Sequence, residues 1–224
     1  MYTKATYQFL EDLVANNNRD WFAENKSRYL QNFVAPSLEL IEQLEKPLRR
    51  VAPFLSASTA KSGCSLMRIY RDTRFASDKT PYKTNIGIQL RHQAGKDVHA
   101  PCIYLHFAAD ESFVGAGCYR PEPAVLAKIR TKIDEDGKAW LKSRDEKWFR
   151  EIYKLAGESL KTTPRDYARN HPLIDDLRRK DFIAVSPLTR QQVLTNDLIE
   201  TLVQRIRSAR PLMRFLCDAI GVPY

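Results

Sequence analysis

The sequence lacks the long apolar runs that would place it in a membrane. No window of its 224 residues approaches the roughly 18 to 20 uncharged apolar residues of a membrane-spanning helix. The opening residues, MYTKATYQFLEDL, interrupt their apolar run with Glu11 and Asp12, so we expect no signal peptide. Apolar residues nevertheless make up 43% of the chain, enough for a sizeable core. We therefore expect a folded, soluble protein without a membrane partner.

Closely spaced cysteines are also missing. A disulfide framework or a zinc ribbon would bring cysteines together in short, regular spacings such as C-x-x-C. The four cysteines here are scattered instead: Cys64, Cys102, Cys118 and Cys217. We therefore expect reduced thiols in a cytoplasmic protein. One alternative stays open, because Cys102 and Cys118 could face each other on adjacent strands as a redox pair.

Signatures of catalysis and of metal binding are absent as well. The four histidines form neither H-x-x-x-H nor H-E-x-x-H, and no carboxylates surround them as in a facial triad. The glycines of SFVGAG, residues 112–117, lack the G-x-G-x-x-G spacing of a phosphate loop, and no G-x-S-x-G elbow occurs. The sequence thus predicts no metal site and no cofactor. Whether any reaction is catalysed, and the oligomeric state, stay open.

Positive charge is what the chain has in excess. Lysine and arginine number 36 against 27 aspartate and glutamate residues, a formal net charge of +9. Such a balance steers a protein toward nucleic acid, anionic metabolites or acidic proteins. The alternative is a basic surface with no specialised role.

The hydrophobic period changes twice along the chain and predicts the fold class. Residues 1–55 have helical spacing, with Asn18 as the N-cap of a second helix. Residues 64–120 have a period of two, which predicts strands over 66–71, 85–91, 102–107 and 112–119. Residues 121–224 are mainly helical, including 140–155 and a long helix behind a Thr189–Gln192 capping box, with a short strand at 182–185. We predict a single α+β domain over 1–224, in which an antiparallel meander packs against N-terminal and C-terminal helices.

The most informative segment is RIYRDTRFASDKTPYKTN, residues 68–85, called the basic segment below. It carries five cations against two carboxylates, a net charge of +3, so one third of the net charge of the chain lies in this short stretch. An arginine fork can bind a phosphate or carboxylate through two parallel hydrogen bonds, and lysine adds a mobile point charge. We predict a cleft that binds a phosphorylated or carboxylated ligand, with Asp72 and Asp78 orienting the cations. Its predicted ligand-binding residues are Arg68, Arg71, Arg74, Lys79, Tyr82 and Lys83.

Two other hypotheses explain the same segment without a small anionic ligand. Arg71 or Arg74 could pair with nearby carboxylates in an ion-pair network that only holds the loop together. Alternatively, single-stranded nucleic acid could stack its bases on Tyr70, Phe75 or Tyr82 while its phosphates meet the cations. No helix-turn-helix, RNP or zinc-finger pattern accompanies this second hypothesis.

An enzyme and a protein-interaction module are two further hypotheses. In a hydrolase-type enzyme, Asp72 or Asp78 would act as general base and His106 as general acid, with an arginine stabilising developing charge. His106 lies two residues after Tyr104 on a predicted strand and is expected to face the same cleft. An interaction module would instead present an exposed apolar patch.

Several motifs of the chain resemble one family. They are NRDWF at Asn18 to Phe22, the basic segment through Thr84, YLH at 104–106, SFVGAG at 112–117 and PEPAVLAKIR at 121–130. The chain is similar, over nearly its whole length, to the family catalogued as domain of unknown function 2461, from bacteria and fungi. This resemblance implies a shared fold and carries no assigned activity, substrate or catalytic residue. We interpret NRDWF as a helix cap followed by core anchors. The alternative is that Arg19 and Trp21 complete the pocket of the basic segment.

Overall fold

Helices form at both ends of the chain, where apolar side chains recur at helical spacing. The computed structural model describes residues 1–95 and 100–224. Asn18 caps α2 (Arg19–Glu24) as predicted, its side chain accepting a hydrogen bond from the Trp21 amide at 2.9 Å. The predicted capping box at Thr189 and Gln192 opens α9 (Arg190–Leu194). The single long helix expected behind this box was wrong, because the chain is extended at Thr195 before it enters α10 (Leu198–Ser208).

The remaining helices lie either before residue 55 or after residue 122 of the chain. None of the helices in the described ranges is long and apolar enough to cross a lipid bilayer. On the N-terminal side they are α1 (Lys4–Ala15), α3 (Lys26–Tyr29), the π-helical turn η1 (Leu30–Val34) and α4 (Ala35–Val51). On the C-terminal side they are α5 (Pro123–Glu135), α6 (Gly137–Asp145), α7 (Lys147–Ile152), α8 (Ile174–Leu177) and α11 (Arg210–Ile220).

The described residues form a six-stranded sheet in the order β1-β2-β3-β4-β6-β5, with every neighbouring pair antiparallel. The predicted meander is confirmed as β2, β3 and β4. The helical assignment of residues 140–155 was wrong at its end, because residues 154–156 pair with β6 at the sheet edge. The strands are β1 (Leu55–Ser56), β2 (Asn85–His92), β3 (Cys102–Ala108), β4 (Ser112–Cys118), β5 (Lys154–Ala156) and β6 (Phe182–Pro187).

The strand predicted over residues 66–71 does not form. Leu66 makes only an isolated bridge to Ile88, and the next bridge joins Tyr70 to Tyr82. Beyond Met67 the chain leaves β2 and hydrogen-bonds to residues 81–83 of its own return path. Since those residues directly precede β2, the segment closes the base of a loop instead of adding a strand to the sheet.

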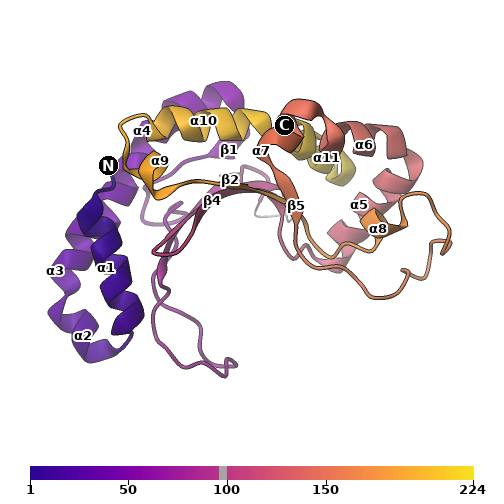
Figure 1. Cartoon of the computed structure of the whole chain (residues 1–224). Helices are drawn as coiled ribbons and strands as arrows, with labels where there is room; N and C mark the ends of the chain where they lie inside the picture. The colour runs from indigo at the N-terminus through magenta and orange to yellow at the C-terminus, as the bar shows by residue number, and fades with distance from the viewer. Residues whose placement is uncertain (96–99) are drawn as a thin grey trace.

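The two faces of the sheet differ in what covers them. Ile88, Leu105 and Val114 point to one side and are fully buried, under the layer that contains α4, α10 and α11 (Figure 1). The buried apolar side chains form one cluster, which includes Tyr2 near the N-terminus and Ile220 near the C-terminus. The alternate residues point to the concave side of the curved sheet, which no helix of the described chain covers (Figure 1). We call this side the open face.

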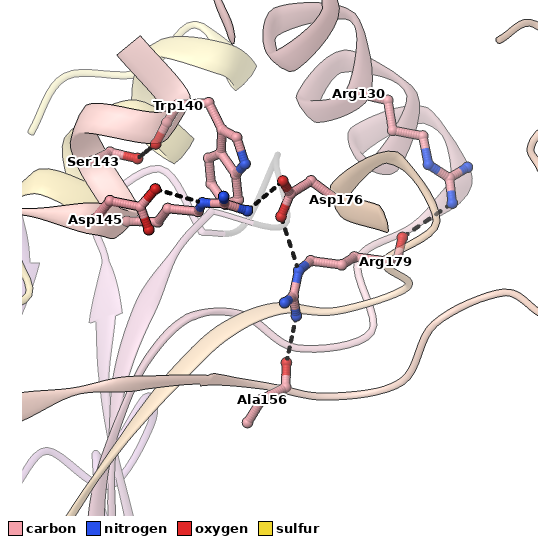
Figure 2. Close-up of polar contacts among 8 residues, drawn as sticks. Arg130, Trp140, Ser143, Asp145, Ala156, Asp176 and Arg179 are labelled. Atoms are coloured by element: carbon pink, nitrogen blue, oxygen red, sulfur yellow. Dashed lines mark hydrogen bonds and ion pairs between the residues drawn. The ribbon is translucent and has the colours of Figure 1, made fainter. Parts of the chain in front are cut away.

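A buried carboxylate fastens the connection between β5 and β6 to the helices (Figure 2). The Asp176 side chain, only 4% exposed, accepts from Arg144 Nη1 at 2.5 Å and from Arg179 Nε at 3.4 Å. Arg179 Nη1 also donates to the Ala156 carbonyl at 3.4 Å, and Arg130 Nη2 donates to the Arg179 carbonyl at 3.0 Å. These contacts join α5, α6, α8 and the edge strand β5.

Candidate functional site

Most of the basic segment forms a loop that extends from the sheet on its uncovered side (Figure 1). We call residues 70–82 the arm. At its base the Tyr82 ring stacks on Phe22, with ring centroids 4.0 Å apart and planes at 19°. The Asn17 side chain binds both backbone groups of Tyr82, donating to its carbonyl at 2.9 Å and accepting from its amide at 3.1 Å. The helices around the NRDWF motif therefore hold the arm in place.

Two arginines of the arm are paired within it. Arg71 Nη1 lies 2.5 Å from an Asp78 carboxylate oxygen and also donates to the Thr80 hydroxyl. Arg74 binds both oxygens of Asp72, through Nε at 2.9 Å and Nη2 at 2.6 Å. The hydrogen bond from Arg71 lowers the pKa of Asp78 to about 2, and the Arg74 guanidinium lowers the pKa of Asp72 in the same way. Arg71 and Arg74 therefore form ion pairs with carboxylates of the arm, as the ion-pair hypothesis expects.

Of the six predicted ligand-binding residues, Arg71 and Lys83 line the basic cleft at the base of the arm. Arg68 is not among its lining residues, although its charge acts on Lys83. The other three lie elsewhere. The exposed Lys79 ammonium donates to the Thr73 carbonyl at 2.9 Å within the arm. Arg74 lies beside Phe75, whose side chain is 96% exposed. Tyr82 is buried in the core at the base of the arm.

A basic cleft lies where the arm joins the open face. It has a volume of about 410 Å³ and is lined by Met67, Arg71, Asp72, Lys83, Asn85, Gly87 and Tyr104. Lys83 is half-buried and Arg68 is exposed. Within the ranges that the structure describes, neither side chain has a carboxylate partner. Burial lowers the pKa of Lys83, and the nearby positive charge of Arg68 lowers it further. The cleft therefore carries the positive charge of Lys83, which pairs with no carboxylate of the described residues.

A second cavity continues from the basic cleft along the open face. It has a volume of about 380 Å³ and shares Met67 and Tyr104 with the cleft. Tyr104 lies at the border of the two cavities with its side chain over Gly87, where an added Cβ would come within 2.8 Å of the phenol oxygen. Asn85 Nδ2 donates to the same oxygen at 3.2 Å. We call the second cavity the apolar floor; its other lining residues include Phe113, Gly115, Gly117, Tyr119, Ile183 and Val185.

Sequence reasoning did not identify the apolar floor as a site. Its signal is present in the alternation of residues 102–107 and 112–119, since every residue opposite the buried face must point elsewhere. Glycines within 112–117 were an additional sign, because a strand glycine permits close approach of a neighbour or ligand. What could not be read from local patterns is that β6 pairs with β4 and supplies Ile183 and Val185.

His106 lies on the open face as expected. Its ring stacks on Phe113 with centroids 4.5 Å apart, and its Nδ1 is 3.4 Å from the Tyr104 phenol oxygen. Burial lowers the pKa of His106 below its ordinary value, so the ring is mostly neutral near pH 7. Neither Asp72 nor Asp78 contacts His106 in the described part of the chain; the carboxylate nearest to its Nε2 is Glu111, at 3.9 Å. The hydrolase hypothesis stays a prediction, because its acid and base have to reach one substrate position and need not contact each other.

The fold and the site together define an α+β protein whose half-covered antiparallel sheet carries a basic cleft beside an apolar floor. The family model described as conserved hypothetical protein (DUF2461) matches residues 5–215, and the chain belongs to this family. The resemblance seen in the motifs is thereby confirmed. Searches of curated proteins and of solved structures found no match. The family description names no activity, so a function has to be argued from the open face itself.

Proposed function

We propose that this protein binds a phosphorylated or carboxylated ligand in the basic cleft. The observation that carries the proposal is the half-buried Lys83, which has no carboxylate partner in the described chain and lies close to Arg68. A partly desolvated ammonium group beside a second cation is costly to maintain. A bound anion would offset that cost, because it replaces the lost hydration with a charge-assisted hydrogen bond.

Each cleft residue has a distinct part in this proposal. Lys83 contacts the anion directly. Arg71 adds a guanidinium whose position is set by Asp78 and Thr80, so little side-chain entropy is lost on binding. Asp72 also lines the cleft, but its charge is compensated by the two hydrogen bonds from Arg74. The cleft consequently stays positive overall.

Replacing Lys83 by methionine tests the proposal. We expect the melting temperature of the wild-type protein to rise with added inorganic phosphate at constant ionic strength. In Lys83→Met the phosphate affinity should fall roughly 10- to 100-fold, since a charge-assisted hydrogen bond is worth about 1.5–3 kcal/mol. The measurement is a phosphate titration followed by thermal unfolding and by amide hydrogen exchange.

Lys79→Met is the matched control, because it removes the same charge from the exposed arm without touching the cleft. Its phosphate affinity should equal that of the wild type. An equal loss of phosphate affinity in both variants would mean that the affinity depends only on the overall charge of the protein. If phosphate changed neither the melting temperature nor the amide exchange rates of the wild-type protein, the proposal would be contradicted.

A second candidate function, binding of single-stranded nucleic acid, is favoured by two exposed aromatic–arginine pairs. Arg74 lies 6.0 Å from the Phe75 ring in the arm, and Arg120 lies 5.2 Å from the Tyr119 ring at the border of the apolar floor. Phe75 is 96% exposed and Tyr119 is 63% exposed. Exposed rings beside guanidinium groups offer stacking positions for bases and contacts for phosphates.

Replacing Phe75 by alanine tests this second candidate. We expect affinity for a labelled oligothymidylate to drop by about 1–3 kcal/mol, the usual value of one base–aromatic stack. The logarithm of the wild-type affinity should fall linearly with the logarithm of salt concentration. Fluorescence anisotropy across a salt series measures both effects. Trp148→Ala, which removes an exposed ring from α7 in the helical layer, should leave the affinity unchanged. Salt-independent binding, or none, would eliminate this candidate.

A further inference from the structure

We infer that the ligand of the basic cleft also carries a flat apolar ring, which lies on the apolar floor. The inference rests on the proposed function for its anionic end. Met67 and Tyr104 line both cavities, so one molecule can reach from Lys83 onto the floor. The floor alone has a volume of about 380 Å³, which is within the range of roughly 300–1,000 Å³ of small-molecule sites.

Gly115 makes the floor flat. Its backbone is in an ordinary strand conformation, and an added Cβ would meet only ordinary contacts, the nearest being the Tyr104 carbonyl oxygen at 3.6 Å. The missing side chain therefore leaves free space above the strand. Gly87 differs, because Tyr104 and Met67 already occupy the space that its side chain would need. The open strip at Gly115 is thus a place where a planar group can approach the sheet closely.

Apolar and aromatic side chains border this strip on both sides. On one side Tyr104 of β3 pairs with Gly115, and Phe113 lies two residues before Gly115 on β4 itself, with the two ring centroids 6.2 Å apart. Ile183 and Val185 come from β6 on the other side. A ring placed over Gly115 would contact aromatic edges and branched aliphatic groups together, which is the composition typical of sites for flat apolar ligands.

The polar groups of Gln89 and of the strand backbones at the floor already have hydrogen-bond partners, which argues for an apolar ring and against a nucleobase. Gln89 donates to the Cys102 sulfur at 3.3 Å, and its carbonyl oxygen accepts from Arg91 at 3.1 Å. The backbones of β3, β4 and β6 hydrogen-bond to one another. The polar edge of a nucleobase would lose its hydrogen bonds to water here and gain few in return. The floor is also an open strip, so an acyl chain would stay partly exposed to water, whereas a ring can bury a whole face.

The test compares three probes with the full chain by isothermal titration calorimetry: 1-naphthyl phosphate, octyl phosphate and inorganic phosphate. We expect 1-naphthyl phosphate to bind at least about tenfold more tightly than the other two, because its ring adds buried apolar area. In Gly115→Val this advantage should disappear while the affinity for inorganic phosphate is retained. Gly115→Ala should give an intermediate loss.

Val185→Thr is a second variant of nearly the same shape, in case Gly115→Val folds poorly. It makes the floor more polar and should also reduce the advantage of the naphthyl group. Equal affinities of the wild type for all three probes would overturn the ring inference and leave the proposed function standing. Naphthyl phosphate binding that responds to Gly115→Val but not to Lys83→Met would overturn the proposed function instead. If Gly115→Val converts a dimer into a monomer in light scattering, the floor is an interface between copies of this chain, and the inference is wrong.

Discussion

Replacing Gly117 by alanine is expected to lower the free energy of unfolding by about 4 kcal/mol or more, a large part of the roughly 5–15 kcal/mol by which folded proteins are stable. Gly117 has φ = +121°, a conformation that L side chains rarely adopt. A Cβ at this position would overlap the carbonyl oxygen of Phe182 and lie 3.1 Å from the Cα atom of Ile183. Both neighbours are backbone atoms of β6, so they can move only if β4 and β6 separate.

Equilibrium denaturation in urea measures this effect, with Gly115→Ala as the matched control on the same strand. Gly115 has ordinary backbone angles and only ordinary contacts around an added Cβ. Its replacement by alanine should therefore change the free energy of unfolding by less than about 1 kcal/mol. If the two alanine variants proved equally stable, the close approach of β4 and β6 at Gly117 would not be what requires glycine there.

Replacing Asp176 by asparagine is expected to cost about 3–5 kcal/mol of stability, the usual penalty for removing one partner from a buried ion pair. The Asp176 side chain is 4% exposed and lies between two guanidinium groups (Figure 2). The side chain of Arg144 is 26% exposed and that of Arg179 is 20% exposed. Without the carboxylate, Arg179 would have no carboxylate partner among the described residues, and Arg144 would keep only Asp145, at 3.2 Å.

The neighbouring Asp175 is the control for this second prediction. Its side chain is 91% exposed and pairs with Arg178 at 3.3 Å, so Asp175→Asn should cost no more than about 1 kcal/mol. Urea denaturation gives the free energies. Limited proteolysis should also cleave Asp176→Asn faster between β5 and β6, since Arg179 holds the Ala156 carbonyl. Similar stabilities of the two asparagine variants would mean that Asp176 does not anchor this connection.

The parts of the fold that the sequence predicted depend on short-range patterns. Ile86, Ile88 and Leu90 alternate with residues that point to the open face because only one face of β2 packs on the core, and that alternation is visible without any coordinates. The capping box from Thr189 to Gln192 spans only four residues, so it too could be recognised locally. The assignment of residues 1–224 to a single domain stays a prediction, although the buried core includes side chains near both ends of the chain.

The predictions that failed depend on distant contacts. Residues 66–71 contain β-formers, but from Ile69 onward their partners are residues 81–83, whose position is set by Asn17 and Phe22. Residues 154 and 155 follow a helical pattern and still pair with Val185 and Ala184 of β6. In both cases a contact between segments well separated along the chain outweighed a weak local preference.

The sequence by itself determined that the cations and aromatic rings of the basic segment are concentrated in one stretch, because composition and spacing are properties of the chain alone. Only the tertiary structure decided which of these cations are neutralised. Arg71 and Arg74 find carboxylates inside the arm, whereas Lys83 is brought to the open face beside Arg68 with no carboxylate partner in the described chain. The apolar floor likewise exists only after folding, when Gly115 pairs with Val185 across 70 residues of chain. The physical reason is that charge compensation and shape depend on distances in space, which long-range packing sets.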